Sequence, residues 1–231
     1  DVDSAVNTVI TTIQYGVPIA RIELLDEAQV DAINQYSKTD LTVAPTLLLE
    51  FHGTDQGVKE QAEIVQEIAV DSGGSNFQWT TNTEERNRLW QARHDAAYAC
   101  KALRPGGEIW ATDVCVPISR LAECIRETQQ DIRDFGLFAP IVGHVGDGNF
   151  HLCLLVGKDD PAESKKANEL HERMVMRALG MGGTCTGEHG VGYGKLDFLV
   201  AEHGEAISVM RSIKQALDPD NIMNPGKVLR V

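Results

Sequence analysis

The stretch IVGHVGDGNFHL at residues 141–152 decides how the central part of this chain folds. Apolar residues flank Asp147-Gly148, a dipeptide that favours a two-residue hairpin turn because aspartate and glycine accept positive φ angles. With that turn, His144 lies directly opposite His151 on one face, with Cβ atoms about 4.5–5.5 Å apart. Two imidazoles at this spacing can reach one divalent metal ion. The stretch therefore predicts a β-hairpin that carries half of a metal site.

A second stretch, TGEHGVGYGK at residues 186–195, offers a carboxylate in Glu188 and a third imidazole in His189. Two histidines and one carboxylate would leave coordination positions open for a substrate. Eleven of the 21 glycines lie between residues 143 and 194, which indicates tight turns or backbone close to a ligand. The alternatives are hydrogen-bonded strand histidines in the first stretch and a flexible surface loop in the second.

Three blocks together give the chain its resemblance to a known family: HVGDGNFH at 144–151, GEHG at 187–190 and DPDNIMNPGK at 218–227. The chain resembles the C-terminal, substrate-capping half of the FAD-linked oxidases of the vanillyl-alcohol oxidase type. Within that family it resembles the D-lactate dehydrogenase (cytochrome) and glycolate oxidase branch, and LWQARH at 89–94 with TDVCVP at 112–117 looks especially like D-lactate dehydrogenase. The resemblance implies an FAD-dependent dehydrogenase that oxidises a D-2-hydroxy acid to a 2-oxo acid and transfers hydride to the flavin.

The resemblance also implies roles for individual residues. A divalent metal, which could be zinc, manganese or iron, would be held by His144, His151 and Glu188. His189 would act as the base, and Arg93 would bind the substrate carboxylate. Asn149 would help to line the substrate pocket, and Asn224 would lie beside the flavin. This chemistry is sound, because a metal lowers the pKa of a bound hydroxyl and an imidazole accepts protons near neutral pH. For Arg93, the alternative is a surface ion pair with Glu84 or Glu85.

No glycine-rich phosphate-binding loop precedes these blocks, so we expect an N-terminal FAD-binding domain that is absent from this chain. The expected partners are that domain, a small 2-hydroxy acid, and an electron acceptor such as a cytochrome, a quinone or an electron-transfer flavoprotein. Alone, the chain should bind FAD weakly and lack dehydrogenase activity. A stand-alone metal-dependent hydrolase could use the same His/His/Glu site, and a regulatory module with a structural metal is a third hypothesis.

Composition restricts the environment of the protein. The formal charge of −13 argues against nucleic acid as a partner, and no run approaches the roughly 20 apolar residues that span a bilayer. Five cysteines without a CxxC pair are typical of reduced thiols in an intracellular compartment. We expect a cytoplasmic location or one peripheral to the inner membrane in a bacterium, and a mitochondrial one in a eukaryote.

Hydrophobic periodicity predicts an α+β fold, a ferredoxin-like domain whose largely antiparallel sheet carries helices on one face. The expected strands are 19–25, 46–52, 77–80, 108–114 and the hairpin, and the expected helices include 26–36, 55–71, 83–103 and 160–180. The substrate and metal cap domain should cover residues 1–198, and a small helical segment should cover 199–231. The apolar stripe of its helix 205–217 is explained by core packing.

Overall fold

The computed structural model describes residues 1–230, in which six antiparallel strands form one sheet. The strand order is β2-β1-β5-β6-β3, and β4 also pairs with β6. The strands are β1 (Ile19–Leu25), β2 (Thr46–Phe51), β3 (Gly107–Ala111), β4 (Val114–Cys115), β5 (Ile141–Gly143) and β6 (Asn149–Gly157). The helices are α1 (Val2–Gln14), α2 (Glu27–Ser37), α3 (Asp55–Asp71), α4 (Thr83–His94), α5 (Ala96–Ala102), α6 (Ile118–Phe135), α7 (Pro161–Gly180), α8 (Leu196–His203) and α9 (Ala206–Leu217). The predicted α+β fold is confirmed.

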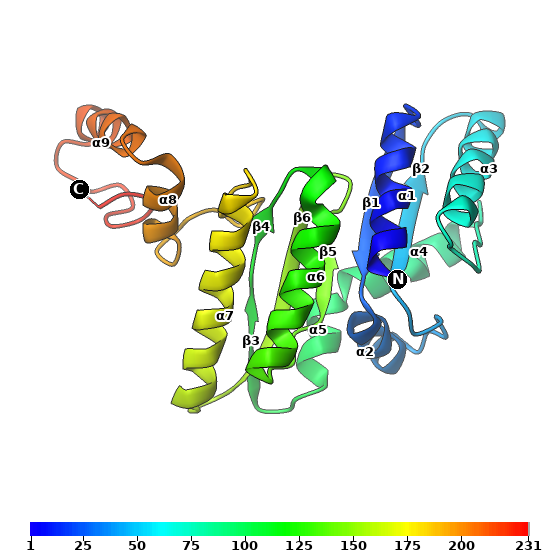
Figure 1. Cartoon of the computed structure of the whole chain (residues 1–231), viewed down its shortest axis with the longest axis horizontal. Coiled ribbons are helices and arrows are strands. Elements are labelled where there is room, and N and C mark those ends of the chain that lie inside the picture. Colours follow the sequence, from blue (N-terminus) through cyan, green and yellow to red (C-terminus); the bar gives the residue numbers. More distant parts are fainter. Residues whose placement is uncertain (231) are drawn as a thin grey trace.

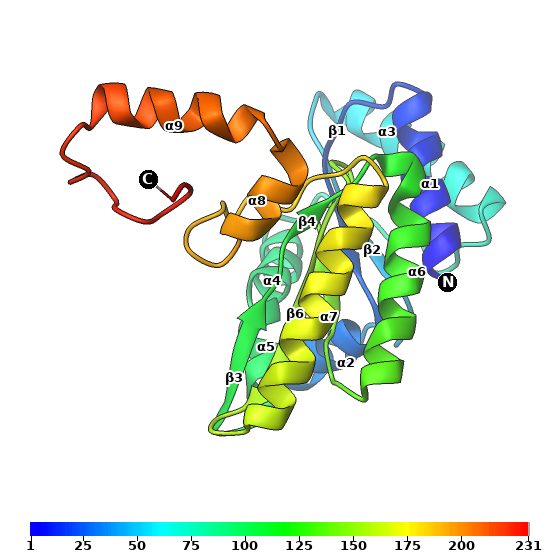
Figure 2. The same cartoon turned by 60° about the vertical axis from the view of Figure 1, so that its left-hand side comes forward.

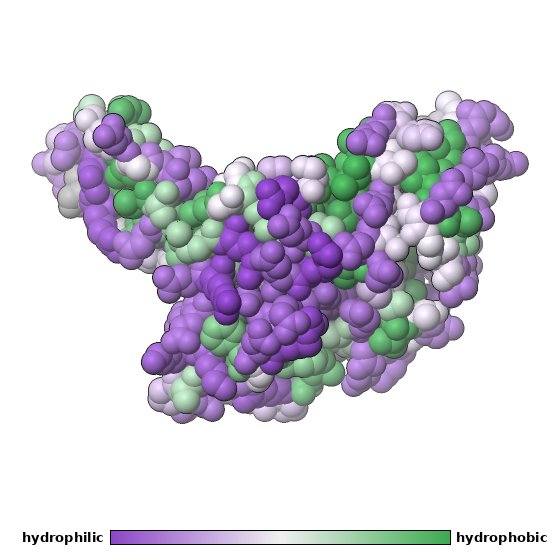
Figure 3. Space-filling view, in the orientation of Figure 1, coloured by the Kyte–Doolittle hydropathy of each residue, from purple (hydrophilic) through white to green (hydrophobic). Residues whose placement is uncertain are grey.

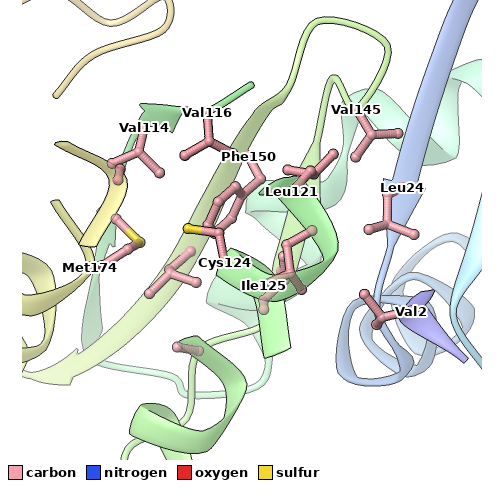
Figure 4. Close-up of a cluster of buried hydrophobic side chains, with 14 of the residues drawn as sticks. Val2, Leu24, Val114, Val116, Leu121, Cys124, Ile125, Val145, Phe150 and Met174 are labelled. Carbon is pink, nitrogen blue, oxygen red and sulfur yellow. The ribbon is translucent and has the colours of Figure 1, made fainter. Parts of the chain in front are cut away.

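The central strand β6 separates two hydrophobic cores, because its successive side chains point to opposite faces of the sheet. Phe150, Leu152 and Leu154 belong to the larger core, beneath α1, α6 and α7. Figure 4 shows Phe150 in this core among side chains from α6, α7 and β1. Each fully buried aliphatic or aromatic side chain here contributes about 1.5–3 kcal/mol of hydrophobic free energy.

Helices also cover the opposite face, so the expectation that helices pack on one face of the sheet is wrong. Cys153 and Leu155 of β6 lie in the second core, together with side chains of α2, α4 and α5. Figure 1 shows α6 and α7 in front of the sheet and the fainter α4 and α5 behind it. The sheet is therefore buried on both faces around β6, and the ends of its strands are left for a site.

The connection between β5 and β6 corrects the predicted hairpin turn. In the structure Val142 pairs with His151, so the loop holds five residues, 144–148, instead of two. Within it the Asn149 N–H bonds the His144 carbonyl and the Gly148 N–H bonds the Val145 carbonyl, the pattern of a Schellman motif. Only Gly148 has a positive φ, of 79°, whereas a type I′ turn needs two such residues.

The error of register is two residues, which leaves the face of every side chain unchanged because strands have a period of two. His144 is therefore diagonal to His151 instead of directly opposite, yet the two rings still meet, with centroids 5.9 Å apart. The prediction that both imidazoles share a face is confirmed, although the turn that led to it was wrong.

Three other predicted elements differ from the structure. Residues 77–80 form no strand, because no strand of the described sheet pairs with them. The helix expected over 83–103 is two helices, α4 and α5, which meet at Asp95. The strand expected over 108–114 is interrupted between β3 and β4, where the buried Asp113 turns its side chain toward polar partners. The break at Asp95 lets α4 and α5 follow different directions beneath the sheet.

The helices α8 and α9 project away from the sheet (Figures 1 and 2). The stripe on α9 is not core packing, since Val209, Ile213 and Leu217 are 60%, 55% and 74% exposed. Hydrophobic colour accordingly reaches the surface over α8 and α9 in Figure 3. The proposed boundary between residues 198 and 199 stays a prediction. Within residues 1–230, no helix is long and apolar enough to cross a membrane.

Candidate active site

Two loops and strand β6 bring three potential metal ligands together at one end of the sheet. The loop after β5 carries His144, β6 carries His151 in its third position, and the glycine-rich loop before α8 carries Glu188. Glu188 Oε1 lies 3.3 Å from His144 Nε2 and 3.0 Å from His151 Nε2. One ligand atom from each of the three residues lies within 4.8 Å of the others. The side chains expected to bind metal are therefore neighbours.

The other ring nitrogens of these histidines are already engaged. His144 Nδ1 lies 2.6 Å from a carboxylate oxygen of Glu23, and His151 Nδ1 lies 2.9 Å from the Thr112 carbonyl. Both partners accept, so each neutral ring carries its proton on Nδ1 and presents the lone pair of Nε2 toward Glu188. Metal-bound histidines in proteins usually have such an arrangement.

The buried nitrogen of His151 gives an independent test of fit. Among the described residues, His151 Nε2 has no hydrogen-bond partner, because its contact with Glu188 has the distance but not the angles of a hydrogen bond. Burial lowers the pKa of His151, with His189 adding to the effect, which favours the neutral ring that a metal requires. A divalent cation would satisfy this nitrogen, so the residues present fit the implied metal.

Asp113 fixes the loop that carries Glu188. Its buried carboxylate accepts hydrogen bonds from the backbone N–H groups of Glu188 and His189 at 3.2 and 3.0 Å. It also accepts from the Thr186 hydroxyl at 2.6 Å, and Lys195 Nζ lies 3.3 Å away. Burial alone would raise the pKa of Asp113, but these donors hold it far below its usual range. An ionised aspartate therefore sets the positions of Glu188 and His189.

The loop also depends on a glycine. A Cβ at Gly187 would overlap the side-chain amide of Asn149, which itself donates to Asp113 and to the Val114 carbonyl, both at 2.8 Å. The side chain of Asn149 is thus buried between β4 and the loop, with its amide nitrogen occupied by protein partners and its Oδ1 without a hydrogen-bond partner among the described residues. Its predicted place in the substrate pocket stays a prediction.

His189 lies at the exposed side of this cluster. Its ring stacks on that of His151, with centroids 4.8 Å apart, and its side chain is 42% exposed. Asp113, His151 and His189 also form a group with metal-ligand spacing. Because Asp113 already accepts from five groups, the His144, His151 and Glu188 set is the better candidate, and this set leaves His189 outside the ligands.

Arg93 reaches the same site from α4. Its Nη2 and Nε lie 2.8 and 3.2 Å from one carboxylate oxygen of Glu23, whose other oxygen meets His144. The alternative surface pair with Glu84 or Glu85 is wrong, because α4 turns Arg93 inward to the sheet. Burial would raise the pKa of Glu23, but the hydrogen bond from His144 and the charge of Arg93 lower it below its ordinary value.

A cleft of about 530 Å³ opens beside this pair. Arg93, Glu23 and His144 line part of it, as do further charged or polar side chains of β1, α4 and the loop after β5. Apolar residues of α1, of β1 and of the segment between them, with Trp90, form the rest of the wall. The cleft thus joins a cationic side chain and a potential metal ligand to an apolar wall, as a site for a small carboxylate with an apolar part requires.

Asn224 does not join the cluster in the described chain. It lies in the C-terminal loop, which packs on the segment before α8 through Val228 N–H to the Gly192 carbonyl, and its φ is 47°. Two residues without a predicted role, Glu23 and Asp113, hold the site together. The signal that could have identified them is an acid inside an apolar strand pattern, IARIELL for Glu23 and ATDVCV for Asp113.

Comparisons with known proteins agree with the family resemblance that the three sequence blocks at 144–151, 187–190 and 218–227 indicated. The chain is 50% identical to a probable mitochondrial D-lactate dehydrogenase of Danio rerio, over all of the chain and 46% of that protein. It is 44% identical to the mitochondrial D-lactate dehydrogenase (cytochrome) of Arabidopsis thaliana, over 99% of the chain and 40% of that protein. It is 30% identical to the glycolate oxidase subunit GlcD of Bacillus subtilis, over 99% and 49% respectively.

The fold has solved relatives as well. The structure of a 4-ethylphenol oxidase from Gulosibacter chungangensis superposes with a TM-score of 0.74 at 16% identity, over 98% of this chain and 51% of that one. The chain spans about half the length of the curated relatives it matches. A family model described as FAD linked oxidases, C-terminal domain, matches residues 1–228. The chain therefore belongs to the family of FAD-linked oxidase C-terminal domains, as its three sequence blocks predicted.

Proposed function

We propose that the chain is the C-terminal, substrate-binding half of an FAD-dependent D-2-hydroxy-acid dehydrogenase of the D-lactate or glycolate type. The observation that carries the proposal is the convergence of His144, His151 and Glu188, with His144 also lining the cleft that Arg93 lines. Membership of the FAD-linked oxidase family and the names of the relatives support the same reaction class. The substrate would be a small 2-hydroxy acid, and the product a 2-oxo acid.

Each side chain has a task in this reaction that its position allows. Arg93 would bind the substrate carboxylate with the guanidinium edge that Glu23 leaves free, since Glu23 uses only Nε and Nη2. His144, His151 and Glu188 would hold a divalent ion, with zinc, manganese and iron all compatible with the donor set. When bound, FAD supplies the hydride acceptor and the metal supplies a Lewis acid that favours loss of a hydroxyl proton.

His189 would accept that proton. It borders the metal ligands, stacks on His151 and remains partly exposed, so it can pass the proton on to solvent. Asn149 would contribute to the pocket from β6, and Asn224 would reach the flavin from the C-terminal loop. Both roles are implied by the resemblance to the family.

The wider setting follows from the relatives. An FAD-binding domain in the same polypeptide would hold most of the flavin, and a cytochrome, a quinone or an electron-transfer flavoprotein would take the electrons. Two of the relatives are named as mitochondrial, which favours a mitochondrial location in a eukaryote. The stand-alone hydrolase gains no support, because the family consists of flavin-linked oxidases. Nor does any contact in residues 1–230 favour a purely regulatory module.

Metal content tests the proposal first. We expect mass spectrometry to find about one divalent ion per chain after incubation with Zn²⁺ or Mn²⁺, and none in His144→Ala, His151→Ala. His203→Ala is the matched control, because His203 lies on α8 outside the cluster and should leave metal content unchanged. A wild-type chain that takes up neither ion would contradict the metal site.

Activity of the flavin-loaded protein that contains this chain is the second test. D-Lactate and glycolate should reduce the bound flavin, and Arg93→Lys should raise KM because an ammonium group cannot form two parallel hydrogen bonds to a carboxylate. Failure of every D-2-hydroxy acid to bleach the flavin would refute the proposed reaction even if metal binds.

A further inference from the structure

One buried carboxylate connects the two halves of the proposed site. Glu23 lies in the middle of β1 with its side chain 5% exposed. Its Oε1 lies 2.6 Å from His144 Nδ1, and its Oε2 lies 2.8 Å from Arg93 Nη2 and 3.2 Å from Nε. The two partners come from α4 and from the loop after β5, which are 70 and 121 residues away along the chain.

Because Glu23 is buried, these contacts are needed to stabilise its charge. A carboxylate removed from water costs several kcal/mol unless charged or hydrogen-bonding partners compensate it. Here one guanidinium and one imidazole N–H provide the compensation, and each oxygen serves a different partner. A neutral amide has a single acceptor oxygen and cannot serve both.

We propose that Glu23 is a positioning residue that fixes His144 for metal binding and Arg93 for substrate binding through one shared carboxylate. The inference rests on the proposed function for the roles of His144 and Arg93. Glu23 holds the proton of His144 on Nδ1, which leaves Nε2 directed at Glu188 as a ligand. It also occupies one edge of the Arg93 guanidinium, which leaves the opposite edge for the substrate in the cleft.

The adjacent strand provides a matched control. Glu50 of β2 likewise meets one arginine and one histidine, with Arg21 Nε and His52 Nε2 each 3.0 Å away. Its side chain is 11% exposed, and neither it nor His52 belongs to the candidate metal group. Glu50→Gln therefore repeats the chemical change of Glu23→Gln outside the candidate metal group.

The first experiment measures metal affinity of the chain by calorimetric titration with Mn²⁺. We expect Glu23→Gln to weaken binding by about 10–100-fold, the usual effect of removing the partner of a ligating histidine. Glu50→Gln should bind Mn²⁺ as the wild type does. Should Glu23→Gln fail to fold, Glu23→Asp keeps the charge but is one methylene too short to meet both partners, and it should weaken binding in the same direction.

A second readout does not need the metal. Long-range ¹H–¹⁵N spectra of the metal-free chain, recorded where His144 is neutral, should show its proton on Nδ1 in the wild type and in Glu50→Gln. Glu23→Gln should contain a mixture of both tautomers. In the flavin-loaded protein, the same variant should raise KM for the hydroxy acid by about tenfold, as loss of one charge-assisted contact predicts.

The outcomes separate this inference from the proposed function. A wild-type chain without metal affinity would overturn the metal site, and the tautomer of His144 would still decide whether Glu23 positions it. Unchanged affinity, unchanged tautomer and unchanged KM in a folded Glu23→Gln would overturn the role of Glu23 and leave the proposed function intact.

Discussion

At the scale of single residues, the site depends on two buried acids, Glu23 and Asp113, and Asp113 accepts the larger number of hydrogen bonds. Asp113 is fully buried, and it accepts from two side chains with neutral donors, two backbone N–H groups and the Lys195 ammonium. These contacts join β4, β6 and the glycine-rich loop. Removing the charge would leave Lys195, itself 8% exposed, without its counter-charge.

We therefore predict that Asp113→Asn lowers the free energy of unfolding by about 3–5 kcal/mol, the cost of breaking a buried charge pair. Urea unfolding of the metal-free chain measures the effect without any contribution from a ligand. Asp147→Asn, an exposed position in the neighbouring loop without a side-chain hydrogen bond in the described chain, should change stability little. Equal stabilities of the two variants would refute this account of the loop.

At the scale of elements, the connection from β5 to β6 places His144. Gly148 adopts a φ of 79°, and a Cβ there would overlap the Val116 carbonyl. The Val116 N–H in turn bonds the Gly148 carbonyl at 3.0 Å. The Schellman loop is thus tied to the segment that follows β4, and the glycine satisfies both a backbone and a space requirement.

Gly148→Ala should accordingly displace the loop and impair metal binding as well as stability, with a cost of roughly 1–3 kcal/mol for the left-handed backbone alone. Gly146→Ala is the control in the same loop, because its Cβ would meet Ile22 at an ordinary 3.8 Å and its φ is not positive. Metal titration and urea unfolding of both variants check the prediction. Normal metal affinity in Gly148→Ala would show that His144 does not depend on this turn.

Periodicity in the sequence was sufficient for elements with a strong local signal. Strand β1 and helix α3 have the predicted bounds, and α7 (Pro161–Gly180) matches the helix expected over 160–180, with Asp160 as its N-cap. The turn at 144–148 was mispredicted because its hydrogen bonds to the segment after β4 are not local. The contacts of Glu23 and Asp113 could not be predicted for the same reason, since their partners lie tens of residues away.

At the scale of the whole molecule, buried carboxylates make stability depend on pH in two directions. Burial raises the pKa of Asp26, the N-cap of α2, to about 7. A carboxyl with a raised pKa contributes stability that is fully present below its unfolded pKa near 4 and is lost as pH rises through about 7. Glu23 and Asp113 have lowered pKa values, so their contributions are present above pH 4 and are lost as pH falls.

Asp26→Asn should isolate the first effect, because asparagine caps a helix about as well as aspartate but does not titrate. We predict that the stability of the wild type relative to Asp26→Asn falls between about pH 4 and 7, by roughly 1.4 kcal/mol per unit of pKa difference, and is constant above. Chemical unfolding at a series of pH values measures this difference. A stability difference that does not vary with pH would mean that the pKa of the Asp26 carboxyl is not raised.

The strand order has a consequence for synthesis. Within this sheet, β1 and β2 leave the ribosome before the other strands, but β5, the second neighbour of β1, follows only after Asp113 and α6 have been made. At about 5–20 residues per second, the 121 residues between Glu23 and His144 take roughly 6–24 s. During this time the β1 edge is open, and the charge of Glu23 opposes pairing with other nascent chains, as charges on edge strands do. We expect Glu23→Leu to increase the aggregation, measured by sedimentation, of chains truncated after residue 140. The acid that later connects Arg93 and His144 would thus also protect the unfinished sheet from aggregation.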